Sequence, residues 1–312
     1  MIDTLVSLDE IREAAARVGA VARRTPLIPA AMPGLFLKCE NLQPMGAFKQ
    51  RGAYNMIAQL PPDVRARGVI TYSSGNHGQA VAMAAQRLGA PALIVMPETA
   101  PSVKVDGARA YGAEVVFAGR TSFDRMRKAE EIAVARGLAI VPPFDHEWII
   151  AGQGTVGLEI LEQCPAVDTV FVPVGGGGLI SGVATAMKRI KPEVTIVGVE
   201  PAGAPKMSSS LAAGKPVTLD NTASIADGLL SLRPGDLTFA HAKAFVDRMM
   251  TVTDEQIASA VKWLFSTARI VSEPSGAATT AAVLARGAPP GTTVAIVSGG
   301  NVAPQDFARY IT

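Results

Sequence analysis

The sequence is short of the residues that build disulfide frameworks, cysteine-based metal sites and membrane spans. It holds two cysteines, Cys39 and Cys164, in 312 residues, too few for a disulfide framework or a cysteine-based zinc site. No apolar run approaches the roughly 18 residues that cross a bilayer. The N-terminus, with Asp3, Asp9 and Glu10, lacks the basic and then apolar layout of an export signal. We therefore predict a cytoplasmic protein with no membrane partner.

An excess of charge of one sign is also lacking, because 29 basic residues stand against 27 acidic ones. No block of like charges marks a nucleic-acid groove, so we expect no nucleic-acid partner. The three histidines, His77, His146 and His241, lack a metal-ligand spacing such as H-E-x-x-H, and we expect each to be structural or to act through its backbone. Apolar residues are abundant, at 48%, which excludes intrinsic disorder. The length suggests two domains of about 150 residues each.

Short apolar runs alternate with helical patterns along most of the chain. We predict strands at 35–38, 69–72, 92–96, 114–117, 169–174, 194–199 and 294–297, and helices at 8–24, 79–88, 121–136 and 180–190. Such alternation is typical of an α/β fold with parallel sheets that are covered by helices on both faces. Ligands of these folds bind at the carboxyl ends of the strands. The loops after Tyr72, Val174, Val199 and Val297 are therefore the expected functional regions.

A run of four glycines, Gly175, Gly176, Gly177 and Gly178, lies between a predicted strand and a predicted helix. Residues without Cβ let backbone N–H groups crowd around an anion, and a helix N-terminus adds partial positive charge. We predict a phosphate cradle here. No G-x-x-x-x-G-K-[ST] motif supports a nucleotide site. The segment 152–157 matches G-x-G-x-x-G but lacks an acidic residue about 20 positions further on, so we interpret it as a tight helix start.

Two other loops offer N–H groups and hydroxyls at strand ends, 73–77 and 298–301. Three loops that could each bind an anionic or polar group imply a ligand with several polar groups. Lys49 follows a phenylalanine in the segment 46–52, and on composition alone such a lysine is more often a solvated helix residue. A desolvated lysine beside a phosphate cradle is, however, the arrangement that traps carbonyl compounds as Schiff bases. Both interpretations of Lys49 stay open on this evidence.

Taken together, these motifs resemble a known family. The matching segments are 35–43, 47–53, 73–79, 150–155, 175–179, 226–228, 273–274 and 298–301. In this order, over nearly the whole chain, they resemble the fold-type-II pyridoxal-phosphate enzymes, specifically the serine/threonine dehydratase and serine racemase branch. The resemblance implies a two-domain, tryptophan synthase β-like fold. Its large domain would span 1–67 and 147–312, its small domain 68–146, and the active site would lie between them. It also implies a homodimer or homotetramer.

The resemblance assigns roles to individual residues. It implies that pyridoxal 5'-phosphate is held by Phe48, Lys49, Asn76, the four glycines with Leu179, Glu273 and Ser298. It implies that the substrate carboxylate binds the loop Ser73, Ser74, Gly75, Asn76 and His77. Lys49 would hold the cofactor and act as the base at Cα, Asn76 would contact the phenolic oxygen, and Ser298 would face the pyridine nitrogen. A neutral hydroxyl at that nitrogen suits elimination better than transamination. Ser231 and Arg125 are weaker candidates for substrate contacts.

The implied reaction is the dehydration of a hydroxy-amino-acid substrate, L-threonine or L-serine, through aminoacrylate to a 2-oxo acid and ammonia. A serine racemase that uses Lys49 and Ser74 on opposite faces is the alternative, as is a dehydratase of another β-hydroxy acid such as 3-hydroxyaspartate. The pair Phe144–Asp145 resembles dehydratases better, and we favour that reaction. Lys49, the glycine run and Ser298 together argue against a non-catalytic cofactor carrier or a metabolite-binding regulator. The segment 48–51 differs from the Val-Lys-Asp-Arg-like core of cysteine synthases, the β-replacement branch.

Three features depart from the family. Ala47 stands where a serine or threonine usually precedes the Phe-Lys pair. Several relatives bind a divalent cation through a Glu, a backbone carbonyl and an Asp. Glu200 and Ala204 fit that pattern, but Lys206 occupies the Asp position, and an ammonium would repel a cation. We therefore expect no metal and hypothesise that the Lys206 ammonium replaces it by pairing with Glu200. The chain ends soon after Asn301, so inhibition by isoleucine through a regulatory domain is not expected.

Overall fold

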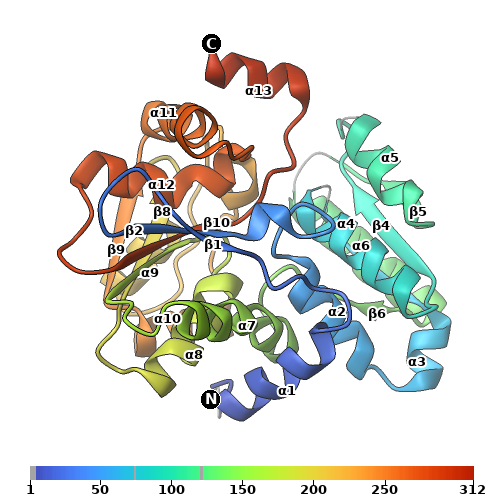
Figure 1. The fold of residues 1–312 in the computed structure, drawn as a ribbon. Coiled ribbons are helices and arrows are strands. Elements are labelled where there is room, and N and C mark those ends of the chain that lie inside the picture. The colour runs from blue at the N-terminus through green and yellow to red at the C-terminus, as the bar shows by residue number, and fades with distance from the viewer. Residues whose placement is uncertain (1–4, 74, 101, 120–121) are drawn as a thin grey trace.

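Two separate β-sheets organise the part of the chain that this computed structural model describes, residues 5–73, 75–100, 102–119 and 122–312 (Figure 1). The larger sheet has the order β1-β2-β10-β7-β8-β9, and all its neighbours are parallel except β1 and β2. Its strands are β1 (Leu27–Pro29), β2 (Leu35–Cys39), β7 (Thr169–Pro173), β8 (Thr195–Pro201), β9 (Arg248–Val252) and β10 (Thr293–Val297). The smaller sheet is wholly parallel, in the order β5-β4-β3-β6. Its strands are β3 (Val69–Thr71), β4 (Ala92–Met96), β5 (Glu114–Phe117) and β6 (Ala139–Ile140).

The central strands are mostly apolar because both faces of each sheet are covered. Every residue of β7 and of β10 is buried. In β10 the side chains of Val294 and Ile296 pack into one core and those of Ala295 and Val297 into another. This is the alternation that a strand requires. All the strands predicted from the sequence are confirmed, with ends that differ by no more than two residues.

Four helices cover one side of the larger sheet (Figure 1). They are α1 (Leu8–Val18), α7 (Glu147–Gln163), α8 (Gly178–Ile190) and α10 (Asp236–Phe245). Those on the other side are α11 (Asp254–Trp263) and α12 (Pro274–Arg286), followed by α13 (Pro304–Ile311). Short elements between them are the 3-10 helices η1 (Glu40–Leu42) and η2 (Asp227–Leu229), α9 (Lys206–Ala213) and a π-helical turn, η3 (Leu264–Ala268).

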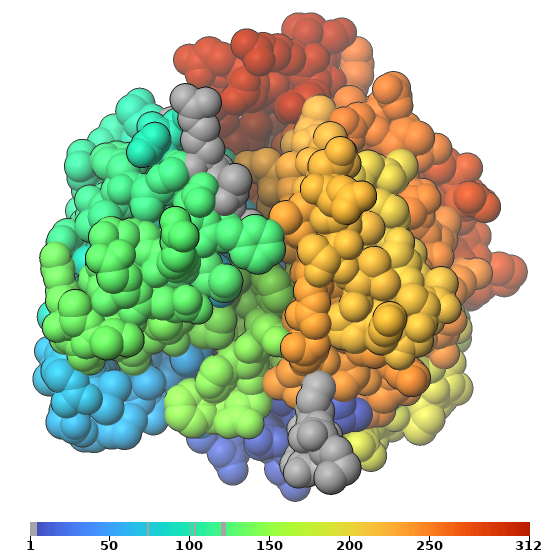
Figure 2. Space-filling model, turned by 180° about the vertical axis from the view of Figure 1, so that it is seen from behind, coloured from blue at the N-terminus to red at the C-terminus, as the bar shows by residue number. Residues whose placement is uncertain are grey.

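The smaller sheet is covered by α6 (Ser122–Arg136) on one face and by α4 (Asn76–Arg87) with α5 (Ser102–Ala110) on the other. The core under α4 also receives Ala53, Met56 and Ile57 from α2 (Gln50–Gln59), which precedes α3 (Pro62–Arg67). Helix α2 therefore packs with the smaller sheet although it lies outside 68–146. The division into domains at those residues stays a prediction. Figure 2 shows the green side chains around α5 and α6 facing the yellow and orange C-terminal half across a furrow.

Two sequence-based predictions are wrong. The first helix ends at Val18 rather than Arg24, because the chain turns at Gly19 and the following residues form no helical ladder. The segment 152–157 is no helix start but lies in the interior of α7. Its glycines serve close packing, since a Cβ on Gly152 would lie 2.6 Å from the Cα of Gly52 in α2. A Cβ on Gly182 in α8 would likewise lie 2.4 Å from the backbone nitrogen of Gly154. Helices α2, α7 and α8 thus approach one another backbone to backbone.

Within the described ranges, no helix combines the length and apolarity that a membrane crossing requires.

Candidate active site

Segments far apart in the sequence meet where the carboxyl ends of the strands approach each other. The Asn76 side chain donates to Glu273 Oε1 at 2.6 Å, and the Asn301 side chain donates to Asn76 Oδ1 at 2.8 Å. The backbone N–H of Phe48 donates to the Ser298 carbonyl at 3.1 Å. Five residues that were predicted to share a site, or to flank one, are therefore joined by contacts in two groups, one of three residues and one of two. They come from the N-termini of α4 and α12 and from the loops before α2 and after β10.

We call the place where these segments meet the junction, and Lys49 supplies its amine group. It is partly buried, and desolvation lowers the pKa of its ammonium to about 8 because burial disfavours the charged form. Its Nζ donates to the Pro143 carbonyl at 2.6 Å and lies 5.3 Å from the centre of the Phe48 ring. A larger share of this amine is neutral near pH 7 than for a solvated lysine, so it is a better nucleophile and base. The solvated-helix interpretation of Lys49 is therefore wrong.

The glycine loop is packed so tightly that side chains would not fit. A Cβ on Gly176 would lie 2.2 Å from the Phe144 ring, and a Cβ on Gly177 would lie 2.8 Å from Thr238. Gly177 also has a φ of 102°, which favours glycine. The Thr238 hydroxyl fixes the loop by donating to the Gly176 carbonyl at 2.7 Å. Helix α8 begins at Gly178, and the first N–H groups of a helix have no partner within it. The loop can therefore receive an anion such as a phosphate.

Glu273 is a buried carboxyl group between the Asn76 and Gly299 segments. It is 6% exposed, and its backbone N–H donates to the Gly299 carbonyl at 3.1 Å. Burial, together with the negative charge of Asp227, raises the pKa of Glu273 to about 8. The group therefore holds a proton through most of the neutral range and can donate a hydrogen bond that an ionised carboxylate could not.

The loop before α4 is built around its glycines. The Ser73 hydroxyl accepts a hydrogen bond from the Gly75 N–H at 3.3 Å, and a Cβ on Gly78 would lie 2.1 Å from the Ser73 carbonyl. Ser74, the predicted second base, lies outside the described residues, so its role stays a prediction. Helix α4 begins at Asn76, which places the loop at a helix N-terminus that suits a carboxylate.

The side chains of all three histidines contact backbone groups. His77 is buried, with Nε2 3.0 Å from the Val141 carbonyl, and burial together with the charge of Lys49 lowers its pKa to about 3. It is therefore neutral at physiological pH. His146 accepts a hydrogen bond from the Trp148 N–H, and His241 accepts one from the Val6 N–H. Over the described ranges, no group of three or more His, Cys, Asp or Glu residues could hold a metal ion.

The roles of the other predicted residues are not tested by the structure. Lys206 Nζ lies 3.4 Å from Glu200 Oε1, the pairing that was hypothesised, and it donates to the Ala204 carbonyl at 3.1 Å. The Ser231 hydroxyl is buried. Arg125 is half-buried in α6, and desolvation lowers its pKa. Whether Ser231 and Arg125 contact a substrate stays a prediction.

Several residues of the site were missed from the sequence. Phe144 covers Gly176, and Asp145 accepts hydrogen bonds from the N–H groups at the start of α10 at 3.0–3.1 Å. The resemblance named Phe144 and Asp145 only as a feature of dehydratases. No pattern in the sequence indicates that they contact the glycine loop and α10. Arg51 donates to both oxygens of Glu40, at 2.8 Å each, and to Glu159 at 2.7 Å. This buried network fixes the start of α2, just after Lys49.

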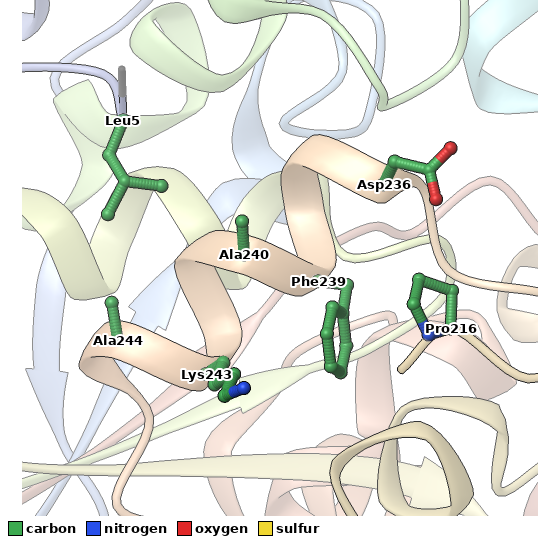
Figure 3. A pocket seen from close by; sticks show the side chains of 7 residues that line it. All are labelled: Leu5, Pro216, Asp236, Phe239, Ala240, Lys243 and Ala244. Atoms are coloured by element: carbon green, nitrogen blue, oxygen red, sulfur yellow. The ribbon is translucent and has the colours of Figure 1, made fainter. Parts of the chain in front are cut away.

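A cavity of about 450 Å³ elsewhere on the protein does not belong to the site (Figure 3). It is lined by side chains of α10, most of them apolar, together with Leu5 and Pro216, and no predicted site residue lines it.

Comparisons with known proteins agree with the geometry. A family model described as "Pyridoxal-phosphate dependent enzyme" matches residues 19–299. Over 98% of the chain and 78% of the relative, the sequence is 44% identical to an L-threonine ammonia-lyase of Thermotoga maritima. It is 39% identical to a serine racemase of Schizosaccharomyces pombe over all of both chains. The solved structure of maize serine racemase matches with a TM-score of 0.94 and 41% identity, covering 98% of this chain and 97% of the other. The solved structure of a threonine deaminase from Solanum lycopersicum, the processed form of isoform 2, matches with a TM-score of 0.90 and 38% identity, covering 99% and 95%.

Proposed function

The chain belongs to the family of pyridoxal-phosphate-dependent enzymes, and from this premise we propose that it is an ammonia-lyase acting on L-threonine or L-serine. The observation that carries the proposal is the junction of a desolvated lysine, Lys49, with the glycine loop and with the Asn76–Glu273 pair. Relatives named as threonine ammonia-lyases and threonine deaminase support the choice of reaction.

The residues of the junction fit the cofactor. The glycine loop leaves no space for side chains and lies at the start of α8, which suits a phosphate. Lys49 offers a partly neutral amine for the cofactor aldehyde. The Asn76 amide and the Ser298 hydroxyl would face the polar edges of the ring. When bound, pyridoxal phosphate supplies the electron sink that stabilises a carbanion at the substrate Cα.

The side chains of this chain would perform the proton and binding steps. Once the substrate amine has displaced it from the cofactor, Lys49 Nζ would take the proton from the substrate Cα, because its lowered pKa keeps part of it neutral at working pH. The Cβ–O bond would then break, and the hydroxyl would leave as water by taking up the proton that Lys49 Nζ removed from Cα. The aminoacrylate that is released adds water and loses ammonia to give the 2-oxo acid. The N–H groups at the start of α4 would orient the substrate carboxylate.

A second reaction, serine racemisation, is favoured by the similarity to serine racemases at 39–41% identity. It needs a proton donor on the face opposite Lys49, and Ser74 is the proposed donor. A racemase and a dehydratase can share the first step, the removal of the Cα proton, so the two activities can coexist. We further propose that the protein acts in the cytoplasm. We also propose that it is a homodimer or homotetramer, and a measurement of its mass in solution at micromolar concentration would test the oligomeric state.

The experiment supplies purified, cofactor-saturated protein with L-threonine, L-serine and 3-hydroxyaspartate, and measures 2-oxo acid and D-serine separately. We expect 2-oxo acid from threonine or serine, lost in Lys49→Ala and kept in Lys215→Ala, an exposed lysine that serves as the control. D-serine formed in excess of 2-oxo acid would instead identify a racemase. If none of these substrates gives 2-oxo acid or D-serine, both proposed reactions are contradicted.

A further inference from the structure

Lys206 is a fully buried cation beneath the glycine loop. It is the first residue of α9 and is 0% exposed. Its Nζ donates to the carbonyls of Leu229 at 2.8 Å, Val174 at 2.9 Å and Ala204 at 3.1 Å. An ammonium has three N–H donors, and each of them has a backbone carbonyl as its acceptor here. This is a closed cage of oxygens around one positive charge.

A carboxylate balances that charge. Glu200 Oε1 lies 3.4 Å from Lys206 Nζ, and both side chains are 0% exposed. Glu200 is itself held by the N–H groups of Met207 and Ser208, at 2.8 and 2.9 Å, and by the Ser208 hydroxyl at 2.7 Å. A cation in the first turn of a helix is opposed by the helix dipole, so helix stability does not explain this lysine. A buried charge of this kind is tolerated only because it is paired and hydrogen-bonded.

The three carbonyls belong to three separate segments of the site. Val174 immediately precedes the glycine loop, Leu229 ends η2, and Ala204 precedes α9. The glycine loop and η2 are in close contact above Lys206, since a Cβ on Gly175 would lie 3.1 Å from the Gly228 carbonyl. In a trans peptide the carbonyl and the next N–H point in opposite directions. By holding the Val174 oxygen, Lys206 therefore also orients the N–H of Gly175.

We propose that Lys206 is a positioning residue, an internal cation that orients the glycine loop for the cofactor phosphate and does so in place of a divalent metal ion. The proposal rests on the proposed cofactor site. The cage offers four oxygens, the carboxylate and three carbonyls, which are the ligands that hard cations take. A divalent ion would enter only if the ammonium were removed and an oxygen ligand put in its place.

The test compares Lys206→Met and Lys206→Asp with the wild type, by titrating pyridoxal phosphate and by thermal unfolding, each in EDTA and in CaCl2. The affinity of the wild type for the cofactor should be the same in EDTA as in CaCl2. Lys206→Met should bind the cofactor about tenfold more weakly, with or without calcium. Lys206→Asp should be equally weak in EDTA and should regain affinity and thermal stability in calcium, because the carboxylate completes an oxygen cage.

The matched control is Lys188→Met. Lys188 also donates to a carbonyl, that of Pro192 at 3.1 Å, and pairs with an aspartate, Asp247 at 2.9 Å, but it lies at the opposite end of α8. Its variant should keep the wild-type cofactor affinity and show no response to calcium. The proposal is overturned if Lys206→Met binds the cofactor as tightly as the wild type, or if EDTA weakens cofactor binding by the wild type. A folded Lys206→Asp that ignores calcium would also overturn it. Because the readout is cofactor binding, a wild type that binds the cofactor without forming 2-oxo acid would contradict only the proposed reaction.

Discussion

Replacing Gly176 by alanine should damage the cofactor site through one steric contact. The added Cβ would lie 2.2–2.3 Å from three atoms of the Phe144 ring. Carbon atoms in contact prefer about 3.5–4.0 Å, so either the ring or the loop must move by more than about 1 Å. Overpacking of this kind costs about 1–3 kcal/mol in free energy of unfolding. If the loop moves, N–H groups leave the phosphate, and each charge-assisted hydrogen bond contributes about 1.5–3 kcal/mol to binding.

The assay for this prediction is a double-mutant cycle read by urea unfolding and by cofactor titration. Gly176→Ala should weaken cofactor binding at least about tenfold, since about 1.4 kcal/mol corresponds to a factor of ten. Adding Phe144→Ala should recover part of that loss, because the clashing ring atoms are removed. Gly19→Ala is the control, since its Cβ would meet nothing closer than 3.4 Å, and it should neither weaken cofactor binding nor destabilise the fold. The reasoning is refuted if Gly176→Ala matches the wild type in both measurements, or if the two substitutions are additive.

Two further predictions concern buried charge. The Glu273 pKa of about 8 lies above its unfolded value of about 4.5, so the stability of the cofactor-free protein should fall as pH rises between these values, by up to about 1.4 kcal/mol per pH unit. Urea midpoints from pH 4.5 to 8 should show a shallower fall in Glu273→Gln, and an equal slope in both proteins would contradict this. Arg51→Met leaves the buried Glu40 carboxylate without its main partner and should cost about 3–5 kcal/mol in free energy of unfolding. Arg24→Met, which breaks only the exposed pair with Glu162, should cost less than about 1 kcal/mol, and similar losses in both variants would show that burial does not govern the effect.

Much of the fold could be predicted because buried parallel strands are distinct in sequence. Runs such as those of β7 and β10 are apolar on both faces and end at glycine-rich loops. The amphipathic pattern of α1 and the charged face of α6 are similarly distinct. The G-x-G-x-x-G segment was misinterpreted because glycine favours loops in local sequence, whereas here it allows α7 to approach α2 and α8. That close approach is a tertiary effect, and the local pattern does not contain it.

Part of the candidate site could likewise be predicted from the sequence, and part could not. The glycine run was predicted from its residue type, whereas Lys49 was given its role only by the resemblance. The contacts that give them their properties join residues distant in sequence, such as Asn76 with Glu273 and Lys49 with the Pro143 carbonyl. The desolvation that lowers the Lys49 pKa depends on this assembled environment, so the sequence could suggest the lysine but not its state.

The central claim is that Lys49 holds the cofactor at this junction. The most direct measurement is to reduce the cofactor-loaded protein with borohydride, which makes the link between an amine and the cofactor aldehyde permanent, and to locate the labelled lysine by mass spectrometry of peptides. The account predicts a single label on Lys49, and none in Lys49→Ala. A label on any other lysine, Lys206 included, or a protein that saturates with cofactor yet carries no label after reduction, would contradict it.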